Sequence, residues 1–164
     1  MALPTGPVTL TVPTDDIQPP ANPPAPTLDV PAGASQKTVG GAEDFVKWWF
    51  GLPVAAINRG STQVIRAYSA PACGECDRLI SETEESIRER WSARPAENPA
   101  VVILDSIVAQ DLATISLVGF APATDYLDAS GAVVETDTAY SVTAAVDVVW
   151  TGTQWQVAQV RGVE

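Results

Sequence analysis

The first half of the chain contains two stretches in which apolar residues recur every three or four positions, the spacing of an amphipathic helix. We expect the first helix over residues 42–58, with an apolar stripe formed by Phe45, Trp48, Trp49, Leu52 and Ala56. Glu43 and Asp44 fall in its first turn, where the helix dipole favours negative charge. Gly60 follows as a stop signal, and Pro53 should kink or locally break the helix because proline lacks an amide hydrogen.

Two further helices are expected before residue 92. Ser61 is a good N-cap for a short helix over residues 62–68. A second long helix runs to about Trp91, and its buried face should consist of Cys76, Leu79, Ile80, Thr83, Ile87 and Trp91. Its opposite face, which we expect to be solvated, carries Glu82, Glu85, Arg88 and Glu89. The two prolines within residues 94–99 indicate a loop.

From residue 100 onward the hydrophobic period changes from helical to two. Strands are expected over residues 101–104, 107–109, 112–119, 133–135, 140–150 and 155–163. Asp128-Ala129-Ser130-Gly131 is a hairpin turn signal. Helices followed by an antiparallel meander predict an α+β fold in which one face of a curved sheet covers the helices.

The first 40 residues differ in composition from the rest. Nine of the 14 prolines lie between Pro4 and Pro31, and proline excludes both a helix interior and a central strand. We therefore divide the chain into an extended, proline-rich tether (residues 1–40) and a single α+β domain (residues 41–164). Within the tether, residues 8–12 alternate like a short strand. The proline run could also serve as a motif for a proline-binding groove.

Charge and hydropathy restrict the partners. The net charge is −11 and there is no histidine, which argues against binding to nucleic acid or to anionic lipid. No stretch is long and apolar enough to span a membrane, and the N-terminus is not a signal peptide. Met1 is either an artificial start that replaces a signal and a lipid-modified cysteine, or a native start. The composition of the following segment favours the first reading.

Cys73-Gly74-Glu75-Cys76 is the sharpest local motif. Two cysteines without histidine cannot supply the four ligands of a structural zinc ion. A redox pair needs an exposed, acidified thiolate, whereas Glu75 and Asp77 place negative charge beside the sulfurs. We favour a structural disulfide between Cys73 and Cys76, with a redox pair and free thiols as alternatives.

Four segments resemble a known family, namely residues 41–50, 69–76, 127–135 and 148–157. They are similar to actinobacterial lipoproteins that contain a domain of unknown function with a fold like that of nuclear transport factor 2. The resemblance covers about residues 40–160, and Pro53 departs from the family's usual helix. It implies a cone in which a curved sheet wraps around helices and leaves a cavity at the open end. It also implies a lipid-anchored, envelope-facing protein with a proline-rich spacer and no catalytic residues.

Enzymes built on related cones use a buried aspartate with a tyrosine or a second acid. The residues that could take these parts are Asp105, Asp111, Asp125, Tyr126 and Tyr140. The two aspartates at 105 and 111 are expected near strand ends or turns. No histidine-containing catalytic set or nucleotide-binding motif is present. We therefore expect no catalytic residues, no metal site and no cofactor.

The sequence leads to one favoured function and two alternatives. We expect a non-catalytic, extracytoplasmic module of the cell envelope that binds a protein partner or an apolar small molecule, and that meets the membrane only through a lipid anchor. The residues expected to line its core or cavity are Phe45, Trp48, Trp49, Trp91, Tyr126 and Tyr140. One alternative is an accessory subunit of a larger envelope or virus-particle assembly, held by its N-terminal arm. The other is a small-molecule isomerase or hydratase that uses the cone cavity.

Overall fold

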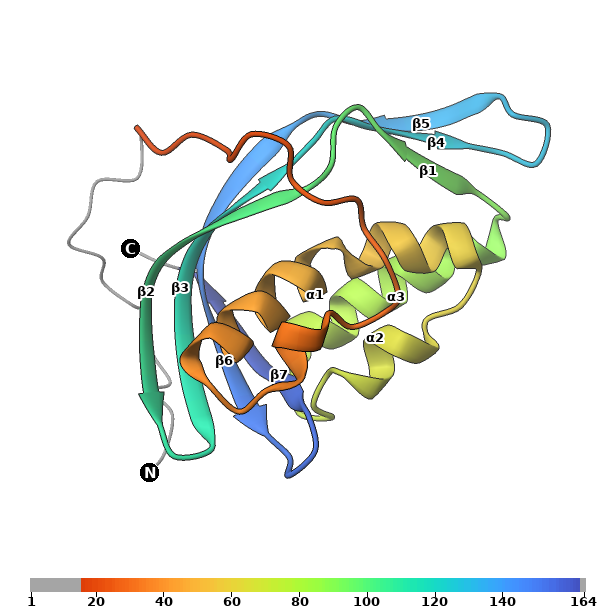
Figure 1. Ribbon diagram of the computed structural model, residues 1–164. Coiled ribbons are helices and arrows are strands. Elements are labelled where there is room, and N and C mark those ends of the chain that lie inside the picture. The colour runs from red at the N-terminus through yellow and green to blue at the C-terminus, as the bar shows by residue number, and fades with distance from the viewer. Residues whose placement is uncertain (1–15, 163–164) are drawn as a thin grey trace.

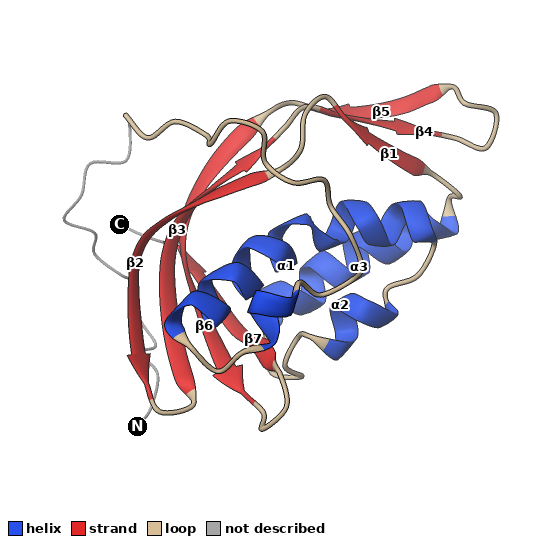
Figure 2. Ribbon diagram, viewed as in Figure 1, coloured by secondary structure: helices blue, strands red, loops and turns tan. Residues whose placement is uncertain are grey.

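The computed structural model describes residues 16–162 and has the α+β architecture expected from the hydrophobic periods (Figures 1 and 2). The helical elements come first: η1 (Ala32–Ser35), α1 (Val39–Arg59), α2 (Gln63–Ala67) and α3 (Gly74–Arg88). The strands follow: β1 (Ser92–Pro95), β2 (Ala100–Ala109), β3 (Leu112–Ala121), β4 (Thr124–Leu127), β5 (Val133–Asp137), β6 (Tyr140–Trp150) and β7 (Trp155–Gly162). The strand expected over residues 8–12 lies outside the described residues.

The strands form two antiparallel sheets, so the expectation of a single sheet is wrong. The larger sheet has the order β2-β3-β6-β7 and the smaller has the order β1-β4-β5. Pro99 separates β1 from β2, and Pro122 separates β3 from β4. Because proline has no amide hydrogen to donate to a ladder, pairing stops at these positions and resumes beyond them in another direction. The chain between β3 and β6 forms the paired strands β4 and β5, which continue the β3–β6 pair beyond this point.

Figure 2 shows the larger sheet curving along one side of α1, with the smaller sheet above the C-terminal ends of α1 and α3. α1 contacts strands of both sheets as well as α2 and α3. The core between these layers is apolar, and its largest fully buried side chains include Phe45, Leu52, Ile65, Ile115 and Trp155. Burial of this surface supplies most of the driving force for folding.

The face of the larger sheet that points away from the helices contains a buried ion pair. Asp147 is fully buried, and its Oδ1 lies 2.7 Å from Nη2 of Arg161. The Thr114 hydroxyl donates to the same carboxylate oxygen at 2.8 Å. A buried carboxylate requires such partners because desolvation of an unpaired charge is strongly unfavourable.

α1 is longer than expected and is not broken. It begins at Val39 because the Thr38 hydroxyl accepts a hydrogen bond from the amide of Gly41, so Glu43 and Asp44 lie beyond the first turn. It continues through Pro53 to Gly60, which adopts φ 80° as a C-cap. Packing of α1 between the sheets and the other helices offsets the one hydrogen bond that Pro53 cannot make, so the expected break does not occur.

Three shorter predictions need correction. The residue before α2 is Thr62, and Ser61 instead accepts a hydrogen bond from the amide of Gln63. α3 ends at Arg88, so Trp91 lies beyond the helix. The segment from Ser92 to Pro95, part of which was expected in a loop, is strand β1. It is held to α1 by the Asn58 side chain, which both accepts from and donates to the backbone of Ala93.

Residues 23–36, called the strap below, lie on the domain. Asn98 donates to the carbonyl of Pro23 at 3.0 Å, and the Trp48 indole donates to the carbonyl of Thr27 at 2.9 Å. The Trp155 indole donates to the carbonyl of Gln36 at 2.9 Å. Leu28 and Val30 pack against the core, and Ala34 is part of it. The division that we placed at residue 40 therefore falls inside α1, and the strap is part of the folded unit.

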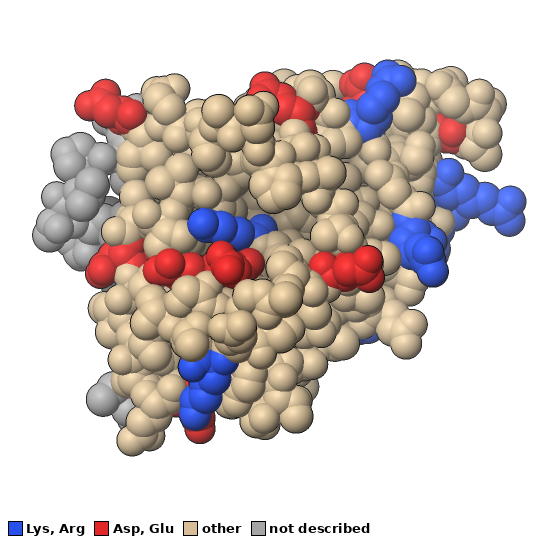
Figure 3. Space-filling view, in the orientation of Figure 1, with Lys and Arg blue, Asp and Glu red and all other residues tan. Residues whose placement is uncertain are grey.

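Charges on the described surface are mixed. Figure 3 shows acidic and basic side chains interspersed over the face formed by α1 and the strap, without a continuous basic patch. A phosphate backbone would therefore find no continuous basic surface on that face. Among the helices of residues 16–162, none has the length and hydropathy needed to cross a membrane.

The contact between the strap and α1 gives a paired prediction for two neighbouring glycines. A Cβ added at Gly41 would overlap the carbonyl of Gln36, whereas one added at Gly40 would meet nothing. We expect Gly41→Ala to lower the free energy of unfolding by about 1–3 kcal/mol through overpacking. Gly40→Ala should raise it by up to about 1 kcal/mol, since alanine is the better helix former. Urea denaturation followed by tryptophan fluorescence measures both, and equal effects at the two positions would show that Gln36 does not rest on α1.

Candidate functional site

A cavity of about 390 Å³ lies between α1, α3 and the concave side of the sheets. Its walls come from elements that are far apart in the sequence, so its shape depends on the whole domain. It is the candidate functional site because concave, mostly apolar spaces of this size are the usual places where proteins bind small molecules.

One wall is a single stripe of α1. Its members recur every three or four residues, which places them on one side of the helix: Val46, Trp49, Phe50, Pro53, Val54 and Ile57. All six are apolar or aromatic. Pro53, which we expected to break the helix, therefore contributes to the cavity wall.

A second wall is a stripe of α3 with the same spacing, formed by Glu75, Arg78, Leu79, Glu82, Thr83 and Ser86. Arg78 stands between the two glutamates. Its Nε donates to Glu75 at 3.0 Å, its Nη2 also pairs with Glu75, and its Nη1 donates to Glu82. These hydrogen bonds, above all those with Glu75, raise the pKa of Arg78 above its ordinary value, so the guanidinium stays charged.

The sheet supplies the third wall. Val142, Ala144 and Val146 alternate along β6 and face the cavity together with Leu117 of β3. On the same strand, Tyr140 lies at the exposed end of this row, with 62% of its surface accessible. The inner part of the cavity is therefore apolar and the end near Tyr140 is open to solvent.

The smaller sheet adds a hydrogen-bonded pair. Tyr126 on β4 and Asp137 on β5 lie on one face of adjacent strands, and the phenol donates to Asp137 Oδ2 at 3.0 Å. Half-burial of Tyr126, followed by the charge of Asp137, raises the pKa of the phenol above its usual range. Trp91 packs on the ring of Tyr126, with 5.9 Å between ring centroids. Tyr126 therefore stays protonated at neutral pH and keeps its proton directed at Asp137.

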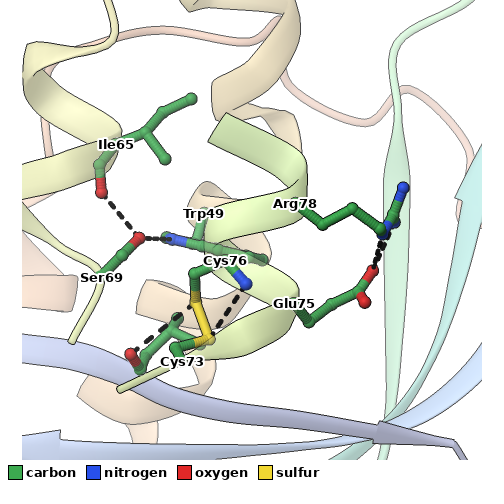
Figure 4. The surroundings of a disulfide bond; sticks show 8 residues. Trp49, Ile65, Ser69, Cys73, Glu75, Cys76 and Arg78 are labelled. Carbon is green, nitrogen blue, oxygen red and sulfur yellow. Dashed lines mark hydrogen bonds and ion pairs between the residues drawn. A yellow bond between two sulfur atoms is a disulfide. The ribbon is translucent and has the colours of Figure 1, made fainter. Parts of the chain in front are cut away.

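Cys73 and Cys76 form a disulfide at the first turn of α3 (Figure 4). Both cysteines are buried, and the Cys73 sulfur accepts a hydrogen bond from the amide of Cys76 at 3.1 Å. A thiol–disulfide exchange site needs an accessible sulfur, so the burial favours the structural reading over the redox alternative. The disulfide fixes the start of α3 and thus the position of Glu75 and Arg78.

A buried hydrogen-bond chain links this region to α1. The Trp49 indole donates to the Ser69 hydroxyl at 3.4 Å, and Ser69 donates to the carbonyl of Ile65 at 2.7 Å (Figure 4). Trp49 thus has its polar atom satisfied away from the cavity and presents only its aromatic surface to it.

The three aspartates that we considered as catalytic candidates lie outside the cavity lining. Asp105 is exposed beside an irregularity in the β2–β3 pairing, and Asp111 forms an ion pair with Lys37 in the turn before β3. Asp125 accepts hydrogen bonds from Thr136 at 2.8 Å and Arg94 at 3.1 Å. These hydrogen bonds, chiefly that from Thr136, lower its pKa, which is the opposite of what a proton-carrying carboxyl in an apolar pocket requires.

The aromatic residues expected in the core or the cavity divide into three groups. Trp49, Tyr126 and Tyr140 line the cavity. Phe45 and Trp48 are buried in the core instead, where Trp48 meets Tyr68 edge to face at 4.9 Å. Trp91 is only half-buried, because α3 ends before it, and it supports the cavity indirectly through Tyr126.

The charged residues of the cavity were missed from the sequence. Glu82 was expected on a solvated helix face and is exposed there, but its place in the cavity lining was not foreseen. Asp137 was not considered. The regular spacing from Glu75 to Ser86 was visible in the sequence. Because this stripe mixes charged and apolar residues, the sequence did not show whether it faces solvent or a cavity. Asp137 could be assigned only once β5 was paired with β4, since that register brings it to Tyr126.

A family model described as "Family of unknown function (DUF6318)" matches residues 11–161. The chain belongs to this family. None of the curated proteins matches it in sequence. Membership in DUF6318 thus covers the strap as well as the helices and both sheets.

Solved structures add information on the fold of this DUF6318 member. The intermembrane space region of the chloroplast protein ARC6 is similar with a TM-score of 0.56 and 12% identity, over 78% of this chain and 98% of that one. At this identity the likeness shows the fold alone. The association domain of C. elegans CaMKII has a TM-score of 0.40 and 16% identity, over 76% of this chain and 95% of that one.

A close contact between β3 and α1 allows the cavity wall to be tested. An added Cβ at Gly119 would lie 2.5 Å from Cε1 of Phe50. We expect Gly119→Ala to lower the free energy of unfolding by about 1–3 kcal/mol because the ring must move. Phe50→Leu in the same chain should recover part of the loss by removing the clash. Urea denaturation of the two single variants and the double variant provides the measurement, and strictly additive losses would contradict the contact.

Proposed function

We propose that this protein is a non-catalytic binding module that takes an apolar small molecule into the cavity between α1, α3 and the sheets. The observation that carries the proposal is the cavity itself. Its volume of about 390 Å³ falls within the range of small-molecule sites, and two of its three walls are apolar. The α1 stripe and the β6 row together would remove most of such a ligand from water.

The arrangement of polar groups supports binding rather than catalysis. Glu75 and Glu82 share Arg78, Asp137 accepts a hydrogen bond from Tyr126, and all three lining carboxylates are exposed to solvent. An isomerase or hydratase of the kind considered above needs a carboxyl whose proton affinity is raised by burial in an apolar site. None of the lining carboxylates of the described residues has such surroundings.

We propose an extracytoplasmic location, with the lipoprotein-type anchoring and actinobacterial origin that the sequence resemblance implies. The Cys73–Cys76 disulfide supports the location, because disulfides persist mainly in oxidising compartments. The curved sheet around α1 and α3 supports the cone that the resemblance implies, with the cavity at its open end. In this proposal the module faces the medium and its cavity is accessible from it.

The contacts of the strap argue against the alternative of an accessory subunit that is held in an assembly by its N-terminal arm. Its contacts with Trp48, Asn98 and Trp155 are made within one domain. An arm that anchors the protein to a neighbouring chain would have to give up these hydrogen bonds or use other residues. The strap therefore favours the binding module.

The proposal can be tested with an uncharged apolar probe, N-phenyl-1-naphthylamine, whose fluorescence rises when it leaves water. The wild-type protein should bind it with saturation. Val54→Trp places an indole into the α1 wall of the cavity and should weaken binding by at least about tenfold. Ile107→Trp adds the same side chain at a β2 position that is 64% exposed and outside the lining, and should leave binding unchanged.

Thermal unfolding of both variants serves as the folding control. No saturable binding to the wild-type protein, or equal weakening by the two folded variants, would count against the cavity as the binding site. Turnover of a small carbonyl compound or hydroxy acid that Val54→Trp abolishes would favour the enzyme alternative instead.

A further inference from the structure

The free hydrogen-bond donors and acceptors of the cavity lining indicate which head group its ligand carries. A ligand's polar group must meet hydrogen-bonding partners that the protein leaves open, because burying an unpaired polar group is unfavourable. Most side-chain donors of the lining have a partner within the protein, whereas several acceptors do not.

Most donors of the two helices are already used. The Trp49 indole donates to Ser69, and the Thr83 hydroxyl donates to the carbonyl of Leu79 at 2.8 Å. Each nitrogen of the Arg78 guanidinium makes one hydrogen bond, to Glu75 or Glu82, which leaves two of its five N–H groups without a partner among the described residues. The Ser86 hydroxyl is directed at the carbonyl of Glu82 at 3.5 Å. The positive charge of Arg78 is thus neutralised by two carboxylates on its own helix.

Two hydroxyl donors of the smaller sheet also have acceptors within the protein. The Thr124 hydroxyl donates to the carbonyl of Pro122 at 3.1 Å, and the Tyr126 phenol donates to Asp137. The phenol oxygen of Tyr126 and the second carboxylate oxygen of Asp137 remain as acceptors. Among the described residues, Tyr140 carries the lining hydroxyl that donates no hydrogen bond within the protein.

The lining therefore offers mainly acceptors, and its charges have a negative sum. Glu75, Glu82 and Asp137 contribute three negative charges and Arg78 one positive charge, which gives −2. The protein as a whole carries −11 and would attract a cation and repel an anion at a distance. A carboxylate or phosphate head group would find few free donors, namely the Tyr140 hydroxyl and two N–H groups of Arg78, and an unfavourable potential.

From this inventory we infer that the cavity selects an apolar molecule with a cationic, hydrogen-donating head group, such as a primary amine, over anionic and neutral analogues. The inference rests on the proposed function and names its ligand class. The apolar body lies between the α1 stripe and the β6 row. The ammonium group is held at the edge by Asp137 and the phenol oxygen of Tyr126, or by the outer oxygens of Glu75 and Glu82.

The test uses three probes with one alkyl chain: decylammonium, decanol and decanoate. Each is used below its micelle concentration to displace N-phenyl-1-naphthylamine from the wild-type protein at neutral pH and low salt. Decylammonium should displace the probe at a concentration at least about fivefold lower than decanol, the factor expected for one nearby opposite charge in water. Decanoate should require more than decanol. Added salt should reduce these differences and leave decanol unchanged.

Variants in the lining should move the preference in opposite directions. Arg78→Gln frees two carboxylates and should strengthen the preference for decylammonium. Glu75→Gln/Glu82→Gln frees the Arg78 donors and should reduce or reverse it. Asp137→Asn should weaken decylammonium binding and leave decanol binding unchanged. Glu97→Gln removes one negative charge outside the cavity lining and should leave the order of the three probes as in the wild-type protein.

Failure of the two proposals can be told apart. If N-phenyl-1-naphthylamine does not bind, the proposed function fails and the inference fails with it. If that probe binds and decanol or decanoate displaces it as well as decylammonium does, the inference alone is overturned. The same holds if Arg78→Gln and Glu75→Gln/Glu82→Gln shift the preference in the same direction, provided that circular dichroism and urea midpoints show both variants folded.

Discussion

The rest of the structure depends on an interruption of the antiparallel ladder at two prolines. Pro99 and Pro122 cannot donate to a neighbouring strand, so pairing stops there and restarts as a second, smaller sheet. The two sheets together make a concave surface that α1 and α3 do not fill. Both prolines line the space that remains. A continuous sheet could lie flat on the helices, whereas this bent arrangement leaves a cavity.

The strap holds α1 from its other side. The indoles of Trp48 and Trp155 donate to strap carbonyls, and Pro26 of the strap lies beside Gly51 of α1. α1 is thus held between the strap and the sheets, so the residues that face the cavity cannot rotate away from it. The disulfide at the start of α3 has the same effect on the second wall. A preorganised cavity binds more tightly because its walls lose little freedom when a ligand enters.

Much of the fold was predictable, and the exceptions have physical causes. The apolar spacing around Phe45 and Trp49 identified α1, and alternation along β6 identified its inner row, because burial imposes these periods directly. The strap was taken for a tether because its proline content describes backbone conformation and says nothing of the indole donors that capture its carbonyls. The partition into two sheets, and with it the contact between Tyr126 and Asp137, depends on strand register, which local sequence does not determine. The pairing of Arg78 with two glutamates follows from helix geometry, but only the position of the sheets shows that this stripe faces a cavity.

The proposed binding of an apolar molecule requires that an apolar space remain open between α1, α3 and β6. Diffraction from crystals of the protein held under xenon pressure tests it most directly, because xenon occupies apolar cavities without needing any polar contact. We expect xenon density bordered by Val54, Leu79 and Val146. Side chains packed across this space, with no xenon between the helices and the larger sheet, would contradict it.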